Sequence, residues 1–148
     1  MDETLKNIQN RIINYLKEYG SQPLLYLCKD NCSEISRLTS YWLYCDNPNN
    51  QYSIIKGTGI KEEKSHDVLA IKDSDKYYLV DPSIWQFFPE ANNIYLGKFN
   101  SVEEISLFLE NKYTGTWSVS EIMSEESFEN RGKWGNIIKS NIQDNSDA

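Results

Sequence analysis

Apolar residues recur at the spacing of an α-helix in two segments near the start of the chain. In residues 2–19 they fall at steps of three and four, and Gly20 follows, which predicts an amphipathic helix that ends there. The same spacing over residues 32–44 predicts a second helix.

The pattern changes after the turn-forming residues 46–50. Runs rich in β-branched and aromatic residues follow at 52–57, 66–72 and 76–81, and each predicts a strand. The last two runs flank the turn formers 73–75, so we expect them to form an antiparallel hairpin.

Helical and irregular segments are expected after this hairpin. Pro82 cannot join a strand ladder, so residues 84–88 should leave the sheet and cover it. A short strand is expected at 93–96, and a capping-box signal opens a helix over 101–111. The apolar residues beyond 113 favour one or two further short helices.

Helices followed by a small antiparallel sheet predict an α+β fold. The 148 residues are 39% hydrophobic, which fits one globular domain; we place it at 1–140, with 141–148 as a frayed C-terminal tail. A domain of this size folds without a disulfide or a metal, so any metal would serve function. We expect no cofactor.

The charge and hydropathy of the chain indicate which kinds of molecule it can bind and whether it spans a membrane. With 15 Lys and Arg against 22 Asp and Glu, the net charge of -7 repels nucleic acid and favours a neutral or basic protein surface. Neither a long apolar run nor a signal-peptide pattern is present, so we expect no membrane span. The expected location is the cytoplasm, or a target cell reached by a route that uses no signal peptide.

Three cysteines, Cys28, Cys32 and Cys45, are too few for a disulfide framework and are expected as free thiols. With His66 they could form a Cys3His zinc set. However, Cys32 and Cys45 stand at opposite ends of one predicted helix, about 20 Å apart at 1.5 Å per residue, so they cannot share a zinc ion. Cys28 follows an apolar run that favours burial, which makes it a poorer nucleophile than Cys32.

Cys32 is predicted to open its helix. Asp30 or Asn31 can serve as the N-cap, and with Asn31 in that position Glu34 completes a capping-box-like arrangement. The helix dipole and the free N–H groups at such a position stabilise a thiolate.

His66 is the only histidine, and the predicted hairpin places it near a carboxylate. A two-residue turn at 73–74 pairs Lys72 with Asp75 and, counted outward, His66 with Asp81. Directly opposed side chains point to the same face of a sheet and can share a hydrogen bond. A longer or bulged turn would shift this register by one or two residues.

Together Cys32, His66 and Asp81 have the roles of a catalytic triad: nucleophile, base and the group that orients the base. The backbone N–H of Cys32 would face an oxyanion, and Gln22 and Asn31 are both candidates for a side-chain donor.

The segments 31–37, 66–70 and 78–83 carry a resemblance to papain-like and transglutaminase-like thiol enzymes. In that superfamily a core helix carries the cysteine, and the following antiparallel sheet carries the histidine and the aspartate. The separation of 15 residues between His66 and Asp81 resembles that in bacterial glutamine deamidase toxins and effectors. The aromatic residue that often follows the histidine is replaced here by Asp67, a departure from the transglutaminase pattern.

The resemblance implies a cysteine hydrolase that acts on a glutamine side chain of a host protein. A thiol protease of the same fold would use the same triad. A non-catalytic acidic binding module, such as an immunity protein, is the alternative from another class. Trp85, just beyond Asp81, is expected either in the core or as a wall of the substrate cleft.

Overall fold

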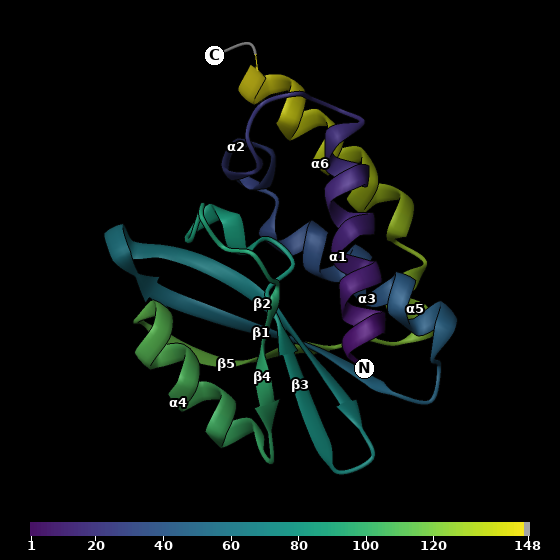
Figure 1. Cartoon of the computed structure of the whole chain (residues 1–148), viewed down its shortest axis with the longest axis vertical. Helices are drawn as coiled ribbons and strands as arrows, with labels where there is room; N and C mark the ends of the chain where they lie inside the picture. Colours follow the sequence, from purple (N-terminus) through teal and green to yellow (C-terminus); the bar gives the residue numbers. More distant parts are fainter. Residues whose placement is uncertain (147–148) are drawn as a thin grey trace.

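Three helices come first along the chain and pack together. They are α1 (Asp2–Lys17), α2 (Leu24–Cys28) and α3 (Cys32–Asp46). The computed structural model describes residues 1–146, and in it the C-terminal helix α6 (Arg131–Ser146) packs against α3 and α2 (Figure 1). The two amphipathic helices predicted at the start of the chain are confirmed.

An antiparallel sheet follows the helices. Within residues 1–146 it has five strands in the order β4-β3-β2-β1-β5. The strands are β1 (Gln51–Ile60), β2 (Lys64–Asp73), β3 (Lys76–Val80), β4 (Tyr95–Phe99) and β5 (Thr116–Ile122). Short helical segments connect or follow them: η1 (Lys61–Glu63), η2 (Ile84–Gln86) and α5 (Glu125–Phe128). The predicted α+β class is therefore confirmed, with β2 at the centre of the sheet.

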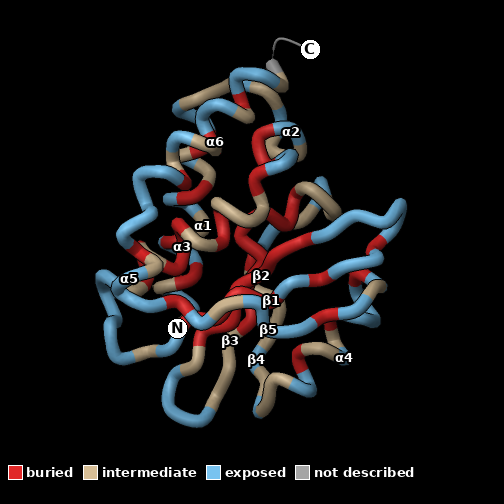
Figure 2. The backbone as a smooth tube through the Cα atoms, turned by 180° about the vertical axis from the view of Figure 1, so that it is seen from behind, coloured by how far each residue is buried: buried red, intermediate tan, exposed pale blue. Residues whose placement is uncertain are grey.

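Different helices cover the two faces of the sheet. Leu69 and Ile71 of β2 belong to a core shared with α1, α3 and α6, whereas Val68 and Ala70 pack against α4 (Val102–Tyr113). This alternation follows from the two-residue period of a strand. Helix α4 lies apart from the other long helices in Figure 1, and the buried parts of the chain gather around the central strands in Figure 2.

The hairpin of β2 and β3 forms, but its predicted register is wrong. Asp73 pairs with Lys76 and Leu69 pairs with Val80, so the turn consists of residues 74–75, one position later than expected. Ser74 has a φ of 59°, the left-handed conformation that such a tight turn requires. The pairing is displaced by two residues, and because strands have a period of two, every side chain keeps its predicted face.

Several other expectations need correction. Only helices were expected beyond residue 113, but residues 116–122 form the edge strand β5. The segment before α3, for which no element was predicted, contains the short helix α2. Residues 141–146, expected to fray, continue α6, because Ile142 is completely buried against the core. Residues 147–148 of the expected tail lie outside the described residues. Among residues 1–146, the helices all fall short of the length and apolar character that a membrane span requires.

Candidate active site

His66 and Asp81 form a buried pair between neighbouring strands. His66 lies near the start of β2, Asp81 directly follows β3, and Nε2 of the imidazole is 2.7 Å from Oδ2 of the carboxylate. Neither side chain is exposed. The hydrogen bond expected from the sequence is present, although the two residues are diagonal rather than direct neighbours across the strands. The backbone N–H of Ser83 donates to Oδ1 of Asp81 over 3.1 Å and fixes the carboxylate.

A third side chain, which the sequence analysis missed, binds the same carboxylate. Tyr113, the last residue of α4, donates its hydroxyl hydrogen to Oδ2 of Asp81, the oxygen that also contacts His66. Burial and the negative charge of Asp81 raise the pKa of Tyr113 far above that of a free tyrosine, so the hydroxyl stays protonated. The helical spacing of the apolar residues in α4 continues to Tyr113, and this places the ring on the buried face but does not identify its partner.

Cys32 is the first residue of α3, as predicted, and is partly exposed. It is close enough to His66 to contribute to the raised pKa of the imidazole. Nδ1 of His66, the ring nitrogen that Asp81 does not bind, is buried and has no partner with full hydrogen-bond geometry. The thiol therefore approaches the ring without completing a hydrogen bond. The structure thus brings together the three residues that the sequence assigns to a triad.

The environment of His66 favours its protonated form. Burial alone would lower the pKa of the imidazole, but the charge and hydrogen bond of Asp81, with a smaller contribution from Cys32, outweigh burial and raise this pKa to about 10. At neutral pH the ring is therefore a buried cation next to a thiol. A proton held in this way can be donated to a leaving group.

Aromatic rings enclose the imidazole. The centroid of His66 lies 4.6 Å from that of Phe87, 5.5 Å from that of Tyr113 and 6.3 Å from that of Trp117. The indole N–H of Trp117 donates to the carbonyl of Thr114 over 2.8 Å, which fixes the ring. These side chains exclude water from the His66–Asp81 pair and so strengthen its electrostatic interaction.

Trp85 is a core residue and not a wall of the site. It is 3% exposed, and its indole N–H donates to the carbonyl of Ala91 over 2.9 Å. The short η2 turn directs Trp85 into the core shared with α1 and α3. Phe87, two residues later, contacts His66 in its place.

Neither predicted side-chain donor for the oxyanion is free to serve in that role here. The Asn31 amide donates to the carbonyl of Leu27 over 3.1 Å, and its oxygen accepts a hydrogen bond of 2.9 Å from Asn141 of α6. Asn31 stands at the N-cap position of α3, but its side chain does not cap the helix, so the expected capping box is absent. The Gln22 amide donates to the carbonyl of Ile142 over 3.4 Å. The backbone N–H groups at the start of α3, which have no acceptor within the helix, are the donors that remain.

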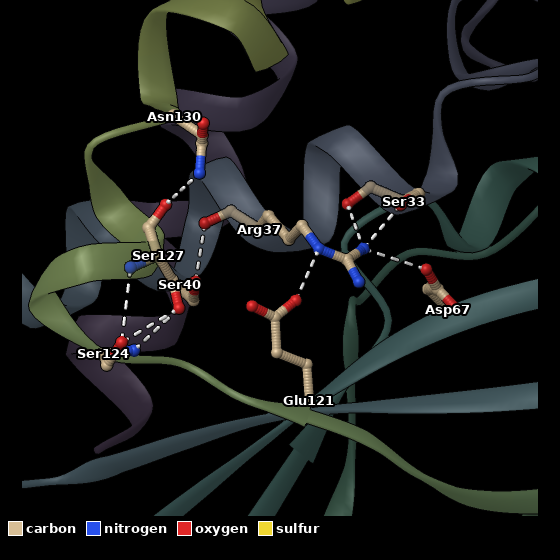
Figure 3. A network of polar contacts seen from close by, with 8 residues as sticks. All are labelled: Ser33, Arg37, Ser40, Asp67, Glu121, Ser124, Ser127 and Asn130. Carbon is tan, nitrogen blue, oxygen red and sulfur yellow. Dashed lines mark hydrogen bonds and ion pairs between the residues drawn. The ribbon is translucent and has the colours of Figure 1, made fainter.

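Arg37 connects the helix of Cys32 to the strand of His66. Its guanidinium lies 3.1 Å from a carboxylate oxygen of Asp67 on β2 and 3.1 Å from one of Glu121 on β5, and it also donates to Ser33 (Figure 3). Asp67 directly follows His66 in the sequence. The sequence did not indicate this contact, which fixes α3 relative to the centre of the sheet.

The other two cysteines are apart from this chemistry. Cys28 is completely buried, and burial, with contributions from Asp81 and Cys32, raises the pKa of its thiol well above the ordinary range. Cys45 is exposed near the opposite end of α3. In the part of the chain that the structure describes, no three His, Cys, Asp or Glu side chains are grouped so that they could hold a metal ion.

The chain was compared with protein-family models, curated proteins and solved structures, and it matches none of them. The resemblance to papain-like enzymes therefore depends on the residues that carry it. The chemistry of the site follows from its geometry: a thiol at a helix start, a protonated imidazole beside it, and a carboxylate that holds the imidazole.

Proposed function

We propose that the chain is a thiol-dependent amide hydrolase of the papain-like superfamily, with Cys32 as nucleophile, His66 as acid and base, and Asp81 as the group that orients His66. One observation carries this proposal: Asp81 binds Nε2 of His66, Nδ1 has no hydrogen-bond partner, and Cys32 is close enough to interact with the imidazole. A base held through one ring nitrogen has the other available for the nucleophile.

The reaction starts with the Cys32 thiolate, which attacks the carbonyl carbon of a carboxamide and forms a C–S bond. Backbone N–H groups at the start of α3 stabilise the oxyanion. His66 gives its proton to the amide nitrogen, the C–N bond breaks, and the amine or ammonia leaves. Water then attacks the thioester, His66 accepts its proton, and the acid product and the free thiolate are restored.

We favour a protein glutamine as the substrate, so that the reaction is a deamidation that releases ammonia. The separation of His66 and Asp81 in the sequence supports this choice, because it resembles that of bacterial deamidase effectors. The net charge of -7 favours a target with a neutral or basic surface. Cleavage of a peptide bond by the same triad is the second enzymatic candidate.

A mixture of basic proteins incubated with the chain tests the proposal. We expect ammonia release and conversion of glutamine to glutamate in mass spectra, both absent with Cys32→Ser. The Cys45→Ser variant is the matched control, because it removes an exposed thiol at the other end of the same helix. New peptide termini in place of ammonia would identify a protease. Equal product with the wild type and Cys32→Ser would contradict both enzymatic assignments.

A non-catalytic acidic binding module is a second candidate, and the complete burial of His66 favours it. In such a module the His66–Asp81 pair would serve only to stabilise the fold. A binding module predicts that Cys32→Ser leaves its function intact, whereas the hydrolase loses its function with the thiol.

A further inference from the structure

Tyr113 and His66 share one oxygen of Asp81. The tyrosine hydroxyl donates to Oδ2, and Nε2 of His66 is 2.7 Å from the same atom. The second oxygen, Oδ1, accepts the backbone N–H of Ser83. The carboxylate therefore contacts three donor groups: a hydroxyl, an imidazole and a backbone N–H. Of these, the Tyr113 hydroxyl can be removed by substitution without changing the imidazole or the backbone.

We propose that Tyr113 is a positioning residue of the site: its hydroxyl donates permanently to Asp81 and so limits how strongly Asp81 retains the proton on His66. This inference rests on the proposed function for its catalytic consequence. The hydrogen bond itself concerns only the three buried side chains and is measurable without a substrate.

The direction of the effect follows from charge. A donor that binds an ionised carboxylate stabilises the negative charge and makes the oxygen a weaker acceptor for its other partner. Without the hydroxyl, Asp81 would interact more strongly with the protonated ring, and His66 would release its proton less readily. In the proposed reaction this would slow the transfer of the proton to the leaving group.

Few other charged groups face this pair, which makes the effect specific. Cys32 approaches the ring of His66 from α3, and Cys28 of α2 lies near Asp81. Two of the aromatic rings around the imidazole, Phe87 and Trp117, carry no charge. Tyr113 is therefore the only titratable residue on α4 that contacts the pair, and its burial keeps it protonated as a donor.

The backbone after α4 fixes the position of Tyr113. Thr114 has a φ of 69° and a ψ of −174°, a conformation that is otherwise nearly restricted to glycine. Its carbonyl accepts the indole N–H of Trp117, and the rings of Tyr113 and Trp117 lie 5.3 Å apart. A strained residue between two side chains that contact His66 indicates that their placement is constrained.

Nuclear magnetic resonance titration of His66 tests the inference, because the chain has one histidine and hence a single set of imidazole signals. We expect Tyr113→Phe to raise the titration midpoint by roughly 0.5–1 pH unit. The matched control is Tyr52→Phe, which removes a buried hydroxyl that donates to the carbonyls of Leu43 and Asn47, away from the site. This control should leave the midpoint unchanged.

A second substitution keeps the inference testable if Tyr113→Phe fails to fold. A fluorinated tyrosine at position 113 has a more acidic hydroxyl, donates more strongly, and should lower the midpoint. An unchanged midpoint in either folded variant at position 113 overturns the inference. If the midpoint shifts as expected but Cys32→Ser has the same activity as the wild type, the role of Tyr113 is upheld and the proposed function fails.

Discussion

Trp117 reaches His66 across a glycine. Gly57 of β1 pairs with His66 on one side and with Trp117 on the other, and the two rings lie edge to face with an angle of 89° between them. A Cβ atom at position 57 would lie 2.5 Å from atoms of the indole ring, which is closer than real contacts allow. The absence of a side chain at Gly57 thus leaves room for the Trp117 ring to pack over the sheet.

Gly57→Ala should displace Trp117 and open one wall around His66. We expect a loss of about 1–3 kcal/mol in the free energy of unfolding, the usual cost of overpacking, measured by urea denaturation. The matched control is Gly132→Ala on α6, where an added Cβ meets no atom within 4 Å. It should stabilise the helix by about 0.5–1 kcal/mol. Equal stability of Gly57→Ala and the wild type would contradict the contact.

The Arg37 contacts should be important for stability, because they are partly removed from water. The side chains of Arg37 and Asp67 are only 17% and 7% exposed. We expect Arg37→Met to lower the free energy of unfolding by about 2–4 kcal/mol, because it leaves the Asp67 charge buried without a partner.

The control for Arg37→Met is Lys64→Met, which removes an exposed ion pair with Glu62. That change should cost less than about 1 kcal/mol in the same urea titration. If the two variants lose the same small amount, Arg37 does not fix α3 to the sheet in the way we describe.

The His66–Asp81 pair predicts a dependence of stability on pH. The pKa of His66 is raised to about 10 in the folded state, above its unfolded value of about 6.5. The stabilisation is therefore complete below about pH 6.5 and is lost as the pH rises through 10, on the order of 2–4 kcal/mol in total. Urea denaturation of the wild type and of His66→Gln across this range measures it. The stability of the wild type should fall toward that of the variant, and parallel curves would refute the interaction.

In the turn after α4, introducing a glycine at position 114 and removing the glycine at position 115 should change the stability in opposite directions. Thr114 is exposed and has a positive φ, so Thr114→Gly should relieve strain and stabilise the protein by about 1 kcal/mol. Gly115 has a φ of 80°, and a Cβ there would lie 2.4 Å from the carbonyl oxygen of Thr58. Gly115→Ala should thus destabilise by more than about 1 kcal/mol. Thermal unfolding of both variants tests the turn, and a shift of the same sign in both would contradict it.

The sequence predicts on which face of the sheet each hairpin residue lies, but not which residue it pairs with on the neighbouring strand. The predicted pairing across the hairpin assigned His66 of β2 and Asp81, which follows β3, to one face, and the two-residue error in the register left that assignment intact. The position of the turn depends on Ser74, a residue that adopts the left-handed conformation here but does not demand it. The pair therefore forms as a diagonal contact, close enough for a hydrogen bond.

Contacts between distant segments were beyond sequence reasoning. Tyr113 and Asp81 are separated by 32 residues, and their hydrogen bond depends on how α4 packs over the sheet. The prediction of only short helices beyond residue 113 rested on counting apolar residues, and it missed the strand β5 around Trp117. Asn31 was placed correctly at the start of α3, yet its side chain turned to α6, because a buried amide needs partners that only the tertiary structure supplies.

The central claim is that His66 activates Cys32, and thiol alkylation with iodoacetamide between about pH 5 and pH 9 tests it most directly. Mass spectrometry of the peptides measures each cysteine separately, so exposed Cys45 is an internal reference and buried Cys28 a second one. We predict that Cys32 reacts faster than Cys45 near neutral pH, although it is less exposed, and that His66→Ala removes this advantage. If Cys45 reacts faster at every pH and His66→Ala changes nothing, the triad is only a structural arrangement.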